Sequence, residues 1–99
     1  MIVVSGVIEV AAENRDQAVA AIVALARVTR LETGCLSYAF YEDVEQTNRF
    51  RVFGEWRDAE ALQKHFRTPH MAAFRDQLIG VEILSRKVQR YDVSAVSEL

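Results

Sequence analysis

Two histidines, His65 and His70, are the residues of this chain best suited to proton-transfer chemistry. They are its only histidines, and they lie in the stretch KHFRTPHMAAF, which also holds its only proline, Pro69. Histidine is the side chain whose charge ordinarily changes near neutral pH, so either ring could act as a general acid or base. Their spacing across a proline does not form a clean pair on one helix face, and the sequence shows no third ligand. No metal site is therefore expected.

The Thr68-Pro69 step between the histidines predicts a helix boundary, because Thr favours the N-cap and Pro the first helical position. His65 would then lie near the end of one helix, where the helix dipole favours its charged form. His70 would lie near the start of the next, where the charged form is disfavoured by roughly 0.3–1 kcal/mol. We therefore expect His65 to titrate at a higher pH than His70.

Hydrophobic patterning predicts the elements before this boundary. Ile2–Val10 is rich in Val and Ile and indicates a strand that is covered on both faces. Apolar residues recur at helical spacing over Arg15–Glu32. Asn14 is the expected N-cap of this helix, and Gly34 follows its end.

The rest of the chain predicts a hairpin, a broken helix and a last strand. The expected segments are strands at 35–42 and 49–57 with the polar turn DVEQTN between them, helices at 59–66 and 70–79, a strand at 81–93 and a tail at 94–99. Asp58 is the expected N-cap of the first of these two helices, and Gly80 ends the second.

The predicted order is βαββαβ, with the second helix broken at Thr68-Pro69. This is the order of the ferredoxin-like α+β fold, in which a four-stranded antiparallel sheet carries its helices on one face. The other face would be bare, yet the first strand has Val or Ile on both of its faces. We therefore expect a homodimer through the sheet face, forming a dimeric α+β barrel, unless the tail covers part of that face.

Composition limits the classes of function. A chain of 99 residues is one domain (1–99, with 94–99 as its tail), and 51% hydrophobic residues are many for so small a monomer to bury. A net charge of −2 argues against nucleic acid or an anionic membrane as a partner. The single Cys35 excludes an internal disulfide, and a free thiol suits a cytoplasmic location. The apolar start MIVVSGVIEV is too short for a membrane span and has no basic region typical of a signal peptide.

Three segments of the chain resemble the antibiotic biosynthesis monooxygenase domain family, especially its small members assigned to quinol oxidation. They are ETGCLSYAFYEDV (32–44), FGEWRDAEAL (53–62) and HFRTPHMAAF (65–74). The family pattern is carried here by Glu32, Gly34, Cys35 and Tyr38, by Glu55 and Trp56, and by His65, Thr68, Pro69 and His70. The resemblance implies a homodimeric barrel with a pocket between helices and sheet in each subunit. It also implies oxygenation of quinols or electron-rich phenolic or polycyclic aromatic compounds with O₂, without metal, flavin or other cofactor.

The resemblance and the residue types together suggest a site. The expected catalytic residues are His65 as base or anion stabiliser, with Tyr38 or His70 orienting the substrate. The expected substrate-binding residues are apolar: Trp56, Phe66, Met71, Phe74 and Phe40. Packing in the core would explain each of these apolar residues equally well. Glu55 is expected to pair with Arg51 or with an arginine of the last strand, and Arg49, Arg51, Arg86 and Arg90 suit exposed edges or dimer contacts better than an anion clamp.

Several functions remain open at this point. The leading hypothesis is a cofactor-independent monooxygenase of a quinol or phenol. The others are an acid/base isomerase of a small carbonyl compound and a non-catalytic module that binds a small molecule. Haem-degrading relatives use an Asn, a Trp and a His, whose places fall here on Ser5 or Gly6, on His65 and on Arg75, which argues against haem degradation.

Overall fold

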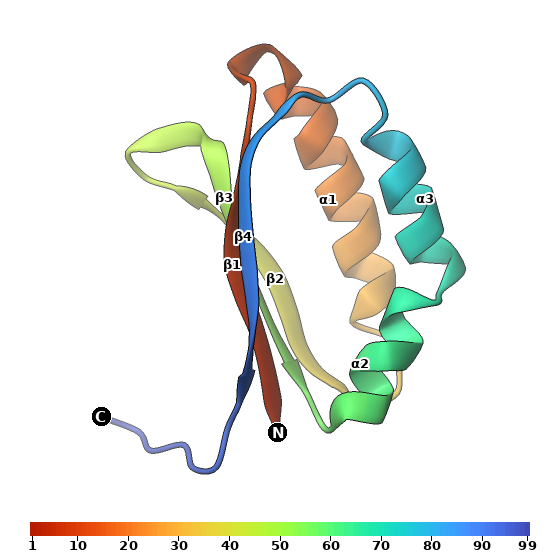
Figure 1. Cartoon of the computed structure of the whole chain (residues 1–99), viewed down its shortest axis with the longest axis vertical. Coiled ribbons are helices and arrows are strands. Elements are labelled where there is room, and N and C mark those ends of the chain that lie inside the picture. The colour runs from red at the N-terminus through yellow and green to blue at the C-terminus, as the bar shows by residue number, and fades with distance from the viewer.

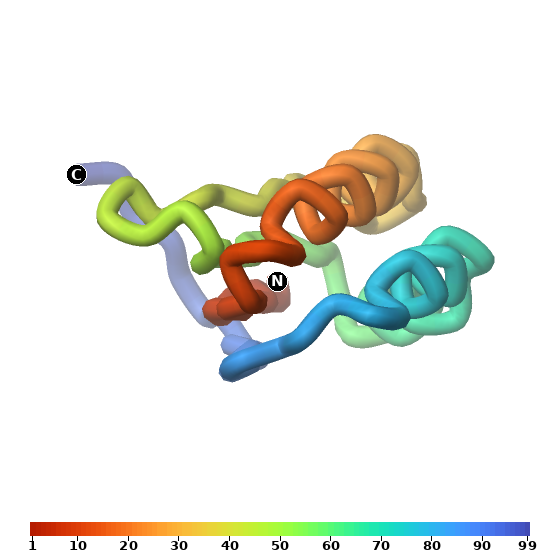
Figure 2. Tube along the Cα trace, turned by 90° about the horizontal axis from the view of Figure 1, so that it is seen from above, coloured from red at the N-terminus to blue at the C-terminus, as the bar shows by residue number.

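The computed structural model describes residues 1–99 as two layers, a sheet and a set of helices on one of its faces (Figure 1). The strands β1 (Ile2–Val10), β2 (Cys35–Asp43), β3 (Gln46–Trp56) and β4 (Ile83–Asp92) pair antiparallel in the order β2-β3-β1-β4. The helices α1 (Arg15–Thr29), α2 (Ala59–Phe66) and α3 (Pro69–Gln77) all lie on one side of the sheet (Figure 2). The predicted ferredoxin-like α+β fold is confirmed. None of the helices is long and apolar enough to cross a membrane.

Helix α1 differs from the prediction at both ends. Asn14 is the last residue of the short 3₁₀ turn Ala12–Asn14 and the N-cap of α1, but its side chain accepts a hydrogen bond from the Glu82 N–H at 2.9 Å instead of capping the helix. The helix ends at Thr29, not at Glu32, because the chain tightens into i→i+3 bonds, such as that from the Glu32 N–H to the Thr29 carbonyl at 3.0 Å. Glu32 therefore lies in a turn that leads to Gly34, whose φ of 87° suits glycine.

The β2–β3 hairpin is tighter than predicted, because only Val44 and Glu45 separate the two strands. Asp43 pairs with Gln46 while Glu42 pairs with Phe50, so the ladder is irregular over residues 47–49.

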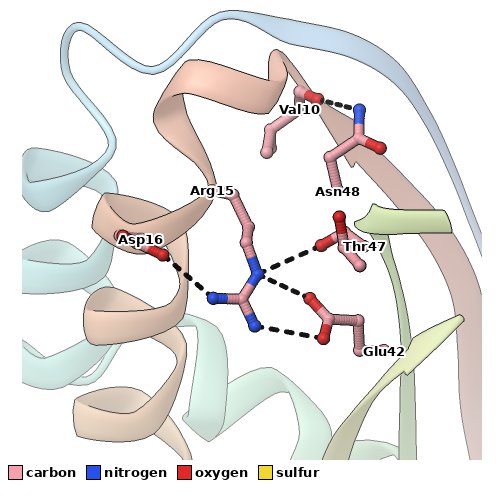
Figure 3. A network of polar contacts seen from close by, with 6 residues as sticks. All are labelled: Val10, Arg15, Asp16, Glu42, Thr47 and Asn48. Carbon is pink, nitrogen blue, oxygen red and sulfur yellow. Dashed lines mark hydrogen bonds and ion pairs between the residues drawn. The ribbon is translucent and has the colours of Figure 1, made fainter.

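Side chains from α1 and the hairpin stabilise this irregular segment. The Arg15 guanidinium donates to both oxygens of Glu42, at 2.8 and 3.1 Å, and to the Thr47 carbonyl at 3.3 Å (Figure 3). Asn48 donates to the Val10 carbonyl at 2.7 Å (Figure 3). The bonds of Arg15 connect the start of α1 to the hairpin, and the bond of Asn48 connects the hairpin to the end of β1.

The predicted break between α2 and α3 is present, and both predicted caps are confirmed. Asp58 accepts from the Ala61 N–H at 2.9 Å at the start of α2. The Thr68 hydroxyl accepts from the Met71 N–H at 3.2 Å at the start of α3 and donates to the His65 carbonyl at 2.8 Å. One side chain thus joins the end of α2 to the start of α3. Helix α3 ends at Gln77 and β4 begins at Ile83, so both elements are shorter than expected.

The core lies between the sheet and the helices. Its larger cluster is built around fully buried Trp56 and includes Tyr38, Val52, Leu25 and Leu62. Gly6 lets β4 approach β1 closely, since a Cβ atom at that position would lie only 2.2 Å from the Lys87 carbonyl oxygen. The edge strand β4 and its side chains are thereby held beside the core.

The sheet face opposite the helices is only partly polar. The register places Val3, Ser5 and Val7 of β1 there, with Phe53 and Tyr91 on neighbouring strands. Phe53 is 37% exposed and Tyr91 47%. The chain after β4 leaves the sheet (Figure 1), and residues 94–99 are exposed, so apolar side chains on this face remain uncovered.

The Thr68→Ala change should lower the free energy of unfolding by about 1 kcal/mol, because it removes an N-cap. Urea denaturation followed by circular dichroism measures this change. Thr68→Ser keeps the hydroxyl and should retain most of the stability. Equal stability of the Ala and Ser variants would contradict the joining role of this hydroxyl.

Candidate active site

A cavity of about 180 Å³ lies between the sheet and the helices. Fourteen of its sixteen lining residues are hydrophobic, and the other two are His65 and Arg86. Phe66 is 50% exposed and Ile83 42%, and Arg86 is exposed as well, so the cavity opens between the helices and the edge strand β4. An apolar cavity of about 150 Å³ can hold one benzene molecule. The space here therefore suits a single aromatic ring.

The structure brings most of the predicted site residues together around this cavity. The lining includes His65, Tyr38, Trp56, Phe40, Phe66, Met71 and Phe74. His70 is not among the lining residues, although its ring centroid lies 6.1 Å from that of His65. Contact of these residues with a substrate stays a prediction.

His65 is a buried histidine in an aromatic environment. It is 3% exposed, and its ring centroid lies 4.7 Å from that of Trp56 and 5.5 Å from that of Tyr38. Burial lowers the pKa of His65 below its ordinary value, and this effect outweighs the opposite effect of Glu32. The expectation that the charged form would be favoured was wrong, because burial has the largest effect on this pKa and favours the neutral form. The lowered pKa favours the neutral ring at pH 7.

Glu32 is the site residue that sequence reasoning missed. Its Oε2 atom lies 2.7 Å from Nδ1 of His65 and 2.6 Å from Nε2 of His70. A carboxylate only accepts hydrogen bonds, so each of these ring nitrogens carries the hydrogen. The neutral His65 ring is then left with Nε2 as an unprotonated acceptor, the form that a general base requires. Only the family pattern beginning at Glu32 could have drawn attention to this residue, since no spacing relates it to the histidines.

Glu32, His65 and His70 also form a possible metal-binding group. Their ligand atoms, one carboxylate oxygen and two ring nitrogens, all lie within 4.8 Å of one another. The sequence showed no third ligand for the two histidines, but the turn after α1 brings one to them. The group therefore has the composition of a three-ligand site for a transition metal.

Polar groups around the cavity lack partners within the chain. Trp56 Nε1 is buried without a hydrogen-bond partner, which costs free energy that a ligand oxygen could recover. The pKa of Tyr38 is raised, mainly by burial, so its hydroxyl stays protonated and can donate. Arg86 also lines the cavity, and its guanidinium is charged at all ordinary pH values. The sequence favoured an exposed edge or a dimer contact for this residue.

Glu55 does not form the predicted ion pair. It accepts a hydrogen bond from the Ser37 hydroxyl at 2.6 Å, while Arg51 donates to the Ser5 hydroxyl at 3.0 Å. The register places Ser37 directly opposite Glu55. It places Val7 opposite Arg51, so Ser5, two residues before Val7 on the same face, is within hydrogen-bonding distance of Arg51. Cys35 is free, and burial raises the pKa of its thiol.

Fold and site together define a ferredoxin-like α+β domain with an aromatic cavity that contains one buried histidine. Comparison with known proteins agrees with this class: the sequence model of the antibiotic biosynthesis monooxygenase family matches residues 1–77. The chain belongs to the antibiotic biosynthesis monooxygenase family, as its resemblance to that family indicated.

Individual relatives support this membership. An uncharacterised protein of Synechocystis is 32% identical over 98 residues, which cover 99% of this chain and 67% of the relative. A Bacillus subtilis protein, provisionally named the monooxygenase YcnE, is 32% identical over 85 residues, covering 86% of this chain and 87% of the relative. A crystal structure from Deinococcus radiodurans, provisionally described as an antibiotic biosynthesis monooxygenase, superposes with a TM-score of 0.91 at 25% identity, covering 100% of this chain and 98% of that one.

The cavity should bind a single-ring phenol and exclude a tricyclic one, because its volume matches one ring. Trp56 is the only tryptophan and lines the cavity, so its indole N–H resonance reports binding. Phenol should shift this resonance saturably, and a tricyclic phenol should not. Val88→Phe should weaken phenol binding because the larger side chain fills the cavity, whereas Val88→Ile should still bind phenol. Equal binding by the two variants would show that phenol binds outside this cavity.

Proposed function

We propose that this protein is a cofactor-independent monooxygenase that oxidises a single-ring quinol or phenol with O₂. The observation that supports it most is the position of His65, whose Nδ1 lies 2.7 Å from Glu32 Oε2 while its ring lines an apolar cavity of one-ring size. The volume favours a monocyclic substrate over the polycyclic compounds that the family resemblance also allows. The free Cys35 thiol suits action in the cytoplasm.

His65 would start the reaction by taking the phenolic proton on Nε2. The resulting phenolate is electron-rich and can pass an electron to O₂, after which the two radicals combine to form a peroxide on a ring carbon. His65 returns its proton to the peroxide, and the hydroperoxide then loses water, whose second hydrogen comes from the same ring carbon. A quinol thereby becomes a hydroxyquinone, and a phenol becomes a quinone. One oxygen atom enters the ring and the other leaves as water, so the quinol supplies all the electrons and no external reductant is needed.

The rest of the cavity would hold the substrate and limit water. The apolar side chains of Phe40, Met71 and Phe74 surround the ring and favour its burial. The Tyr38 hydroxyl and the unpartnered Trp56 N–H are donors for substrate oxygens. Arg86 at the mouth would stabilise the negative charge that develops when the proton leaves.

The test is oxygen consumption with a single-ring hydroquinone in buffer that contains a metal chelator, corrected for autoxidation. The wild-type protein should form hydroxyquinone, and His65→Gln should reduce kcat by roughly 10²–10⁴-fold, the usual contribution of a general base. Lys64→Gln is the matched control, because that neighbouring side chain is exposed and outside the cavity.

An unchanged rate in His65→Gln would exclude the proposed mechanism. The same assay without oxygen separates the other hypotheses. Turnover of a carbonyl compound that continues without O₂ would indicate an isomerase, and binding with no turnover in either condition would indicate a binding module.

We further propose that the protein forms a homodimer through the sheet face opposite the helices. This face leaves Phe53, Tyr91 and Tyr41 exposed on the same side of the sheet as Val3 and Val7. Burying apolar side chains of this kind against a second copy is favourable, and the same face on both copies would meet about a twofold axis.

Phe53→Glu should convert the dimer to a monomer, because it would bury an unpaired carboxylate in the interface. Sedimentation velocity measures the change. Leu31→Glu is the control, since Leu31 is 84% exposed and lies in the turn after α1, away from this face. A Phe53→Glu protein that remains dimeric would rule out this interface.

A further inference from the structure

One ring nitrogen of each histidine lies within hydrogen-bonding distance of the same atom. Nδ1 of His65 and Nε2 of His70 approach the same atom, Oε2 of Glu32, at 2.7 and 2.6 Å. The three side chains come from α2, α3 and the turn after α1. Convergence of ring nitrogens on a single position is what a bound cation requires of its ligands.

The chemistry of these ligands fits a first-row transition dication. Two imidazoles and a carboxylate form a common three-residue set for Zn²⁺, with water in the fourth position. Zn–N and Zn–O bonds are about 2.0–2.2 Å long, so an ion could replace the two shared hydrogens with a small withdrawal of the carboxylate. The side chain of Glu32 is 13% exposed and that of His70 18%, so an ion can enter from the surface.

We propose that Glu32, His65 and His70 form a binding site for a divalent transition metal such as Zn²⁺, and that its occupation turns off the base in the cavity. The binding itself is independent of the proposed reaction, whereas the loss of activity rests on it. Neither Glu32 nor His70 lines the cavity, so the ion would lie on the Nδ1 side of His65 and not beside the substrate.

A change of tautomer at His65 would carry the effect. A neutral imidazole has one N–H and one acceptor nitrogen. Without metal, the hydrogen is on Nδ1 and is donated to Glu32, and Nε2 can accept a proton. With metal on Nδ1, the hydrogen must be on Nε2. The nitrogen available to the cavity then becomes a donor and can no longer remove a proton from a phenol.

The first test is calorimetric titration of chelator-treated, full-length protein with Zn²⁺ alone. The wild type should bind one equivalent, and Glu32→Gln and His70→Ala should each weaken the binding by at least about tenfold, since each removes a ligand. Glu60→Gln is the matched control, because this exposed carboxylate pairs only with Lys64 and should not affect the affinity. Circular dichroism verifies that each variant is folded.

The second test reads the His65 tautomer by long-range ¹H–¹⁵N NMR. Nε2 should be unprotonated in the metal-free protein and protonated when Zn²⁺ is bound. Failure of the wild type to bind one equivalent, binding unaffected by both ligand substitutions, or an unchanged His65 tautomer would each overturn the proposal.

The activity assay separates this inference from the proposed function. If Zn²⁺ binds and moves the hydrogen of His65 but no quinol is oxidised, the metal site is supported and the oxygenase is not. If the metal-free protein oxidises a quinol and stoichiometric Zn²⁺ leaves the rate unchanged, the regulatory role is excluded while the oxygenase stands.

Discussion

The hydrogen bonds of a single carboxylate oxygen hold together the part of this domain that contains both histidines. Glu32 Oε2 accepts from His65 and from His70, and so joins the turn after α1 to both helices that follow the hairpin. Buried polar groups are costly unless they are paired, so these contacts make the mutual position of the three segments specific. The orientation of the His65 ring follows from this position, and the chemistry of the cavity follows from the ring.

The break between α2 and α3 is part of the same arrangement. A continuous helix would carry His65 and His70 on different faces, because five residues advance the chain by more than one turn. The restart at Thr68-Pro69 changes the direction of the chain, and the Thr68 hydroxyl holds the two helix ends together through the His65 carbonyl and the Met71 N–H. A local capping signal thus has a consequence for the site, because it allows both rings to reach one carboxylate.

The sequence predicted the elements well where the signal is local and poorly where tertiary contacts decide. The strand pattern, the Asp58 and Thr68 caps and the helix break were all recoverable, because each depends on residues within one turn or strand. The pairing of Glu32 with the histidines was not recoverable, since Glu32 is 33 residues from His65 and no periodicity relates them. The sequence also did not predict that His65 favours its neutral form. A helix dipole contributes roughly 0.3–1 kcal/mol. Burial can shift a pKa by several units, and each unit corresponds to about 1.4 kcal/mol.

The two nitrogens of His65 lie in different environments. Nδ1 faces a carboxylate near the surface, while the ring forms part of a cavity lined almost entirely by apolar side chains. The group bonded to Nδ1 decides which nitrogen of His65 carries the hydrogen. It therefore also decides whether Nε2 is a hydrogen-bond acceptor or a donor. The protonation of Nε2 matters more in apolar surroundings, because few water molecules are present there to accept a proton in its place. The one-ring volume limits which molecules can enter the cavity, so the size of a bound molecule and the protonation of the histidine depend on different parts of the structure.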